Sequence, residues 1–234
     1  MPRKTRMYLP GVPVHVVQRG HNRDACFFAD EDFRYYQHLL AEGMKRYGAE
    51  LHAYCLMTNH VHLLFTPHQP DSLSRLMQHV GSLYVRYINR TYRRSGTLWE
   101  GRHKGSLVDA ENYLLSCYRY VELNPVTACM VERPEQYRWS SFRRNALGEP
   151  DPLVTEHSIY TRLSRDLEAR QAAYHDLFRF SLPDQDRKAI AECLSASHVL
   201  GSSRFKEQVE ATLGRKVGYA SAGRPRIGRP TYES

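Results

Sequence analysis

Two neighbouring stretches of alternating residues constrain the fold of this 234-residue chain more than any other feature. Residues 51–57 and 60–66 are rich in apolar side chains at every second position, and only Thr58 and Asn59 separate them. Successive side chains of a strand point to opposite faces of a sheet, so this spacing predicts two antiparallel strands joined by a hairpin or a sharp bend.

The rest of the pattern places this hairpin in a larger sheet. Residues 14–19 also alternate, and a glycine-interrupted strand is expected within 98–108. Apolar residues recur at helical spacing over 30–47, 71–92 and 110–123. The order strand, helix, strand, strand, helix, strand, helix predicts an α+β fold of ferredoxin-like or RRM-like topology, an antiparallel sheet with helices on one face.

The alternation also assigns side chains to the two faces of the sheet. Val61, Leu63 and Phe65 are expected on an apolar face, as is the set Leu51, Ala53, Cys55 and Met57 of the preceding strand. The opposite face is expected to be an open site rather than a packing surface. It would collect His15, Arg19, His52, Tyr54, His60 and His62.

Beyond Pro125 the sequence predicts a helical extension. Residues 154–180 are expected to form one charged amphipathic helix, and 184–197 and 203–213 a helical pair around Gly201. That pair is compatible with a DNA-binding helix-turn-helix, although a plain αα-hairpin is more common. The expected organisation is a catalytic domain over 1–150, the extension over 151–214, and a flexible basic tail over 215–234.

The net charge of +8 suggests a polyanionic partner, and its distribution is more informative than its total. Tyr84, Tyr87, Tyr92 and Trp99 lie among basic residues, an arrangement that suits a phosphate backbone with unstacked bases. A solvated helix face with tyrosines partly in the core would give the same pattern. The basic residues of this stretch are Arg86, Arg90, Arg93, Arg94, Arg102 and Lys104.

Four residues could carry chemistry together. His60 and His62 project to the same side of one strand, about 6 to 7 Å apart, a separation that one metal ion can bridge. Tyr120 and Asn124 lie one helical turn apart, so an amide oxygen could bind the ion that the phenol approaches. Spacing alone leaves the alternatives open, because Asn124 before Pro125 can be a helix cap and Tyr120 a core aromatic.

Five segments together resemble the REP-associated tyrosine transposases, within the HUH single-tyrosine transposase superfamily. The resemblance covers roughly residues 8 to 148 in the family's order, and the combination is specific although His-x-His alone is not. The segments are residues 17–23 (VQRGHNR), 55–65 (CLMTNHVHLLF), 98–102 (LWEGR), 118–126 (YRYVELNPV) and 139–142 (WSSF).

The resemblance implies a mechanism. His60 and His62 would be the metal ligands, Asn124 the third ligand, and Tyr120 the nucleophile rather than Tyr118. The expected activity is cleavage and strand transfer of single-stranded DNA, often beside a hairpin, through a 5′-phosphotyrosine. Cellular availability favours Mg²⁺ or Mn²⁺ as the ion. Arg19, Arg23 and Arg102 are further candidates for phosphate contacts.

A second hypothesis is a non-catalytic protein that binds single-stranded nucleic acid on an RRM-like sheet, with His52 and Tyr54 stacking on bases. The chain is expected to be a monomer or homodimer. Five widely spaced cysteines indicate no disulfide framework, so a cytoplasmic location is expected. The resemblance implies that this is the cytoplasm of a bacterium, in association with the nucleoid. No apolar run reaches the ~18 to 20 residues of a membrane span.

Overall fold

The computed structural model describes residues 8–217, so most of the predicted basic tail, from position 218 onward, lies outside the described residues. The strands are β1 (Val14–Arg19), β2 (Ala49–Met57), β3 (His60–Pro67) and β4 (Lys104–Leu107). The helices are α1 (Asp30–Tyr47), α2 (Ser72–Thr91), α3 (Ala110–Glu122), α4 (Asn124–Thr127), α5 (Phe142–Leu147), α6 (Ser158–Thr161), α7 (Leu167–Asp176), α8 (Asp184–Ala196) and α9 (Ser203–Leu213). Short 3₁₀ turns are η1 (His21–Arg23), η2 (Pro134–Gln136) and η3 (Leu177–Arg179).

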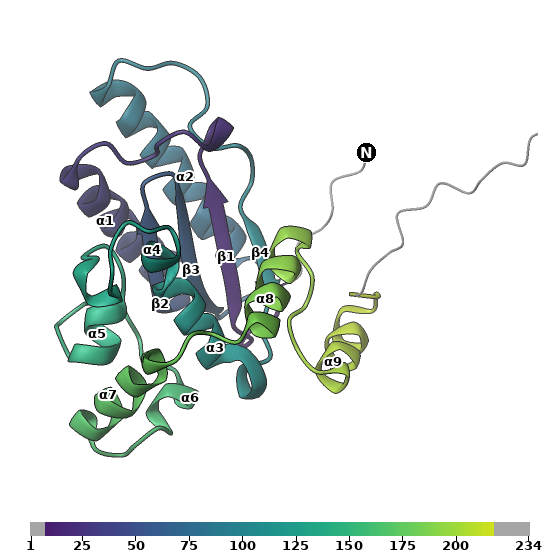
Figure 1. The fold of residues 1–234 in the computed structure, drawn as a ribbon. Coiled ribbons are helices and arrows are strands. Elements are labelled where there is room, and N and C mark those ends of the chain that lie inside the picture. The colour runs from purple at the N-terminus through teal and green to yellow at the C-terminus, as the bar shows by residue number, and fades with distance from the viewer. Residues whose placement is uncertain (1–7, 218–234) are drawn as a thin grey trace, which may run out of the picture.

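The four strands form one antiparallel sheet in the order β2-β3-β1-β4. This is the order that a split βαβ chain produces, and the predicted α+β, ferredoxin-like fold is confirmed. The two central strands, β1 and β3, are therefore held on both edges, so the side chains that they carry stand on the most constrained part of the sheet (Figure 1).

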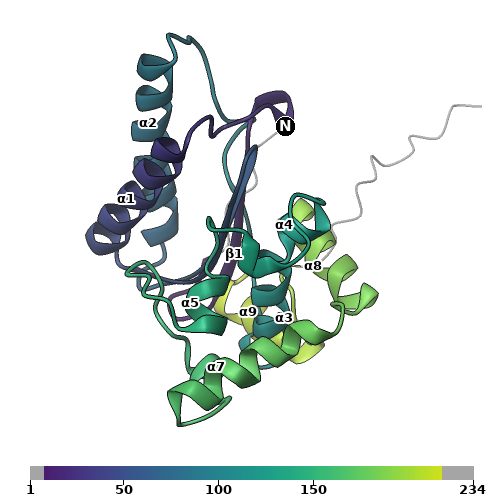
Figure 2. The same cartoon turned by 60° about the vertical axis from the view of Figure 1, so that its left-hand side comes forward.

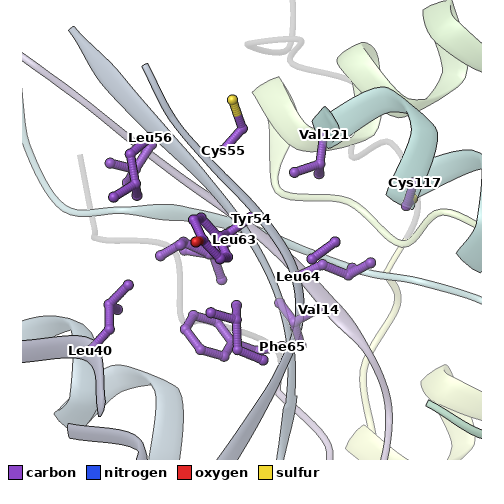
Figure 3. Packing of buried hydrophobic residues seen from close by; sticks show 14 of the residues in the cluster. Val14, Leu40, Tyr54, Cys55, Leu56, Leu63, Leu64, Phe65, Cys117 and Val121 are labelled. Carbon is purple, nitrogen blue, oxygen red and sulfur yellow. The ribbon is translucent and has the colours of Figure 1, made fainter. Parts of the chain in front are cut away.

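Helices α1 and α2 cover one face of the sheet, and α3 with the C-terminal helices covers the other (Figure 2). Figure 3 shows both packing layers: Leu40 of α1 faces Leu63 and Phe65, while Cys55 and Leu64 lie on the side of α3. The second face is thus not open along its length. The part of it near one end of β1 and β3 borders a cavity.

A β-bulge changes the predicted faces of β2. Leu51 pairs with Phe65, but Ala53 pairs with Leu64, because one extra residue is inserted between them. Every later side chain of β2 is therefore on the opposite face from the one that strict alternation predicts. The assignment of Tyr54 to the polar face was wrong, since its hydroxyl accepts a hydrogen bond from Gln37 of α1.

The same bulge moves Ala53, Cys55 and Met57 to the face of His62, where Cys55 pairs directly with His62 and Met57 with His60. His52, the inserted residue, is buried and hydrogen-bonds Thr66 on that face. The predicted apolar set Leu51, Ala53, Cys55 and Met57 is thus divided between both faces.

The extension differs from prediction in one segment. Residues 154–180 do not form one helix but the short α6, the longer α7 and the turn η3. Asp166 starts α7 anew, because its carboxylate accepts a hydrogen bond from the backbone N–H of Ala169. The predicted helical pair is present as α8 and α9, and α8 packs against β4, β1 and α3. None of the described helices combines the length and the apolarity that crossing a bilayer requires.

Candidate active site

The predicted site residues meet at a cavity of about 480 Å³ at the end of β1 and β3. We call it the His–Tyr cavity. Its wall contains Arg19, His60, His62, Arg102, Tyr120 and Asn124. Helix α8 completes the wall with Ala191, Leu194 and Ser195, although it lies about 70 positions later in the sequence than Tyr120. The cavity therefore draws on both the predicted catalytic domain and the extension.

His60 is held through one ring nitrogen by the residue that precedes it. Its Nδ1 lies 2.6 Å from Oδ1 of Asn59, and Nδ2 of Asn59 donates to the carbonyl of Arg23 at 2.9 Å. Because an amide oxygen only accepts hydrogen bonds, the proton of the neutral ring stays on Nδ1. Nε2 of His60 is thereby left with its lone pair, the form that a metal ligand needs.

His62 stands on the same face of β3, one pleat further along, and it is buried. Its Nδ1 lies 3.0 Å from Nε2 of His15, a buried residue of β1. The ring centroids of His60 and His62 are 4.9 Å apart, so the expected pairing of the two imidazoles is present. His62 and His15 both meet the ring of Tyr120 edge-on, with centroids 5.8 and 5.7 Å away.

Tyr120 reaches the cavity from the last turn of α3, and Asn124 follows as the first residue of α4. Nδ2 of Asn124 donates to the carbonyl of Tyr120 at 2.7 Å and more weakly to that of Val121 at 3.3 Å. The side chain is thus held against the end of α3 rather than capping α4, for which Leu123 is the N-cap. With its NH₂ group engaged there, Asn124 retains its amide oxygen as an acceptor.

Tyr118 occupies the opposite side of α3, as a shift of two residues around a helix requires. It is buried, and its ring stacks on Tyr160 with centroids 6.4 Å apart. Of the two tyrosines, Tyr120 is the one whose side chain lines the His–Tyr cavity in the described part of the chain.

Burial sets the protonation state of the histidines. It lowers the pKa of His60 to about 4, with the positive charge of Arg19 acting in the same direction and a side-chain hydrogen bond with Asn124 acting against it. Burial also lowers the pKa of His62 well below its usual value, and that of His15 to about 3. All three rings are therefore neutral at physiological pH, as metal ligands must be.

The pKa of the Tyr120 phenol is shifted in the other direction. Burial raises its pKa above the ordinary value, and the nearby Arg19 and Arg187 only partly offset this effect. In this environment Tyr120 is a protonated, weak nucleophile. A further positive charge close to the oxygen is needed to favour the phenolate.

The predicted DNA-binding residues divide into groups. Arg19, Arg102 and Lys104 line the cavity, and Arg23 follows on the adjoining turn η1. Arg86 is exposed on α2 and lines, with Arg102, a second groove of about 750 Å³. Arg90 and Arg93 are exposed toward and just beyond the end of α2, and the structure does not bring them to the cavity wall. Arg94 is half-buried and lies over the ring of Phe28.

The aromatic residues of this stretch belong to the core. Tyr84 and Trp99 are buried, and the hydroxyls of Tyr87 and Tyr92 both donate to the carboxylate of Asp32 on α1. They are thus engaged in packing α2 against α1 and do not form a surface on which bases could stack. Of the two interpretations of this stretch, a surface for unstacked bases or a helix whose tyrosines pack partly in the core, the second applies to its aromatic rings.

Sequence reasoning missed Asn59, Glu100 and the wall supplied by α8. Asn59 appeared only as a turn residue, although its position directly before His60 is the signal that could have identified it. Glu100 contributes a carboxylate to the cavity wall, and its backbone N–H donates to the carbonyl of Arg19 at 2.9 Å. The contribution of α8 has no local signal, because it depends on how the extension folds back over the sheet.

Comparisons with known proteins agree with this geometry. The family described as "Transposase IS200 like" matches residues 9–124. A Haemophilus influenzae protein assigned to the REP-associated tyrosine transposases is 26% identical over 119 residues, covering 46% of this chain and 67% of that protein.

Two solved structures are also similar. A REP-associated tyrosine transposase bound to a REP hairpin matches with a TM-score of 0.55 and 16% identity, over 68% of this chain and 93% of the other. A transposase-family structure from Deinococcus radiodurans matches with a TM-score of 0.36 and 21% identity, over 50% of this chain and 95% of the other.

The sheet is ferredoxin-like and carries a histidine pair against a tyrosine, and the family match covers all four of its strands. Together these features define a transposase of the IS200-like class. The transposase family that the sequence motifs predicted is confirmed at this level, and within it the chain is similar to the REP-associated tyrosine transposases.

Proposed function

We propose that this transposase cleaves and rejoins single-stranded DNA through a covalent bond between Tyr120 and a 5′-phosphate. The observation that carries the proposal is the meeting of Tyr120 with His60, His62 and Asn124 in one cavity, from one strand and two helices. Residues 1–150 would carry these groups, and the extension would close the cavity through α8.

The chemistry follows from the side chains. Oη of Tyr120 forms a bond to phosphorus while the bond from phosphorus to the 3′ oxygen breaks; the phenol proton leaves to water, and the released 3′ oxygen takes up a proton. Because the energy of the phosphodiester is kept in the phosphotyrosine, a second 3′-hydroxyl can attack it in the reverse sense and restore Tyr120.

The residues present fit a divalent ion, which we propose to be Mg²⁺ or Mn²⁺. His60 offers the lone pair of Nε2, His62 offers its second ring nitrogen, and Asn124 offers an amide oxygen, all uncharged. Two nitrogens and one oxygen suit Mn²⁺ well, while Mg²⁺ prefers oxygen ligands and would keep more of its waters. When bound, the ion supplies positive charge that polarises the phosphate and favours the phenolate.

The substrate we propose is single-stranded DNA adjoining a hairpin. The similar transposase solved with a REP hairpin supports a hairpin partner. Arg19, Arg102 and Lys104 at the cavity wall, with Arg23 beside it, would neutralise the backbone around the cleaved phosphate. Arg86, Arg90 and Arg93 could extend this surface along α2, whereas Arg94 is less suited because it packs on Phe28.

The alternative of a non-catalytic binder on an RRM-like sheet is less well supported. It needs aromatic side chains on an open sheet face, but Tyr54 lies on the face that α1 and α2 cover, and His52 is buried. Helices α3 and α8 occupy the face where bases would stack. We therefore retain only the enzymatic proposal.

The test is incubation of the protein with labelled hairpin DNA carrying a single-stranded flank, in the presence of Mn²⁺, followed by a denaturing gel. A covalent protein–DNA adduct is expected for the wild type and is absent in Tyr120→Phe. Tyr118→Phe is the matched control, since it removes the same atom from the same helix on the other side. Loss of the adduct in Tyr118→Phe with its retention in Tyr120→Phe would overturn the assignment.

A further inference from the structure

His15 is the buried partner of His62, and the proposed chemistry does not yet use it. Its Nε2 lies 3.0 Å from Nδ1 of His62, joining β1 to β3 between residues that are diagonal neighbours in the ladder. Both rings are buried. Nδ1 of His15 is also buried, and among residues 8–217 it has no hydrogen-bond partner.

A hydrogen bond between two neutral imidazoles has one proton in it, so the pair has two possible arrangements. In the first, Nε2–H of His15 donates to Nδ1 of His62, and the proton of His62 is on Nε2. In the second, Nδ1–H of His62 donates to Nε2 of His15, and the proton of His15 is on Nδ1. The two differ in which ring nitrogen of each histidine holds a proton.

The two arrangements have different consequences at each end. The first leaves Nδ1 of His15 as a bare lone pair, but it also leaves His62 without a lone pair on Nε2, the nitrogen that His15 does not occupy. The second gives His62 that lone pair, but it buries an N–H of His15 that has no acceptor in the described part of the chain. An unpaired buried donor is costly, so the first arrangement is favoured until something binds Nε2 of His62.

We propose that His15 is a positioning residue that controls the tautomer of His62, and that the pair changes from the first arrangement to the second when a divalent ion binds. This inference rests on the proposed function, since it requires His62 to be a metal ligand. His15 thus differs from Asn59, whose amide oxygen holds His60 permanently in the ligand form.

The change conserves protons within the pair. His62 releases its Nε2 proton to water in the His–Tyr cavity, the shared proton moves from Nε2 of His15 to Nδ1 of His62, and Nδ1 of His15 takes up one proton from water. Two protons are present before and after. The affinity of the site therefore contains the cost of the buried N–H on His15. A side chain at position 15 that cannot accept from Nδ1–H of His62 raises this cost, because the unpaired N–H is then on the ring that binds the ion, which is the stronger donor.

The first experiment reads the tautomers of the wild-type protein directly. Long-range ¹H–¹⁵N NMR of the histidine rings is recorded without metal and with Zn²⁺, a diamagnetic probe ion. We expect both His15 and His62 to be protonated on Nε2 without metal and on Nδ1 with Zn²⁺, while His60 is protonated on Nδ1 throughout. Zn²⁺ binding with unchanged tautomers of His15 and His62 would overturn this inference but not the proposed metal site. Failure of Zn²⁺ and Mn²⁺ to bind at all would overturn the proposed metal site, and this inference with it.

The second experiment measures Mn²⁺ affinity by calorimetry in two variants. His15→Phe leaves Nδ1–H of His62 without an acceptor, and the affinity is expected to fall about 10- to 100-fold. His15→Gln offers an amide oxygen to that N–H and is expected to stay within about threefold of the wild type. His52→Gln is the control, a buried histidine of the same sheet that does not line the cavity, and its Mn²⁺ affinity is expected to be unchanged. Equal affinities for His15→Phe and the wild type would contradict the proposal.

Discussion

The hydroxyl of Tyr174 on α7 donates to the carboxylate of Glu122 on α3 at 2.6 Å, and both side chains are buried. Ser141 and Asn145 donate to the other carboxylate oxygen at 2.5 and 2.9 Å. Glu122 lies only two residues after Tyr120, so the helix that presents the proposed nucleophile to the cavity is fixed on its opposite side by this network. The extension therefore supports the position of Tyr120 in two ways: α7 holds the opposite side of α3, and α8 forms part of the cavity wall.

Glu122→Ala is expected to destabilise the protein by about 3 kcal/mol, because three buried hydrogen bonds to the carboxylate are lost at once and a cavity is left in its place. The measurement is urea unfolding followed by circular dichroism. Glu149→Ala is the control, since Glu149 is exposed and its contact with Arg143 is 3.7 Å long; its effect should stay within about 0.5 kcal/mol. Equal midpoints for the two variants would show that the network does not stabilise α3.

The same carboxyl predicts an unusual pH dependence. Burial raises the pKa of Glu122 to about 7, against the hydrogen bonds from Ser141, Tyr174 and Asn145, from an ordinary value of 4.5. Between these two pH values the folded state holds a proton that the unfolded state has lost. The contribution of Glu122 to stability is therefore fully present below pH 4.5 and is lost as the pH rises through about 7.

Glu122→Gln isolates this effect, because the buried histidines, which act in the opposite direction as the pH falls below 6.5, are common to both proteins. From pH 7.5 to pH 4.5 the wild type is expected to gain roughly 3 kcal/mol relative to the variant. Unfolding curves of both proteins across this range give the difference directly. A difference that does not vary with pH would mean that Glu122 titrates normally.

Sequence periodicity was sufficient for the topology of the sheet, whereas the residues that meet in the cavity were indicated by their spacings together with the family resemblance. The period of two in β3 places His60 with His62, and the four-residue spacing places Tyr120 beside Asn124. The tertiary structure brings the two pairs together at the cavity. Both spacings are local, so they follow as soon as the strand and the helix are assigned correctly. The expectation that the two pairs meet came instead from the family resemblance, because spacing alone left Asn124 open to a capping role and Tyr120 to a core role.

What the sequence could not provide depends on contacts between distant segments. The bulge at the start of β2, which turns Tyr54 to the other face, is decided by pairing with β3 and by packing on both sides of the sheet. The hydrogen bond between His15 and His62, and the wall of α8 at the cavity, depend on tertiary packing that local periodicity does not encode. The interruption of the predicted 154–180 helix had a local signal in Asp166, whose capping role competes with helix continuation.

Asn124→Asp is expected to change the ion preference of the site. It replaces the uncharged amide oxygen with a carboxylate, and carboxylates are preferred by Mg²⁺. Adduct formation supported by Mg²⁺ should therefore increase relative to that supported by Mn²⁺, although the total yield should fall because the variant no longer donates to the carbonyl of Tyr120. The ratio of adduct yields with the two ions is the measurement. Asn112→Asp, on the exposed N-terminal part of α3, is the control and should leave this ratio unchanged.

Arg102→Ala is expected to weaken binding of single-stranded DNA and to reduce its salt dependence. Arg102 is exposed at the cavity wall and also lines the groove beside α2, where a strand entering the cavity would pass. Each phosphate contact that is lost lowers the slope of log affinity against log salt concentration by about 0.7 for single strands. Fluorescence anisotropy at several salt concentrations gives the slope. Arg162→Ala removes an equal charge from a residue that is paired with Glu111 and does not line the cavity, so it should leave the slope within error of the wild type. If both variants lower the slope equally, Arg102 acts only through net charge and makes no phosphate contact of its own.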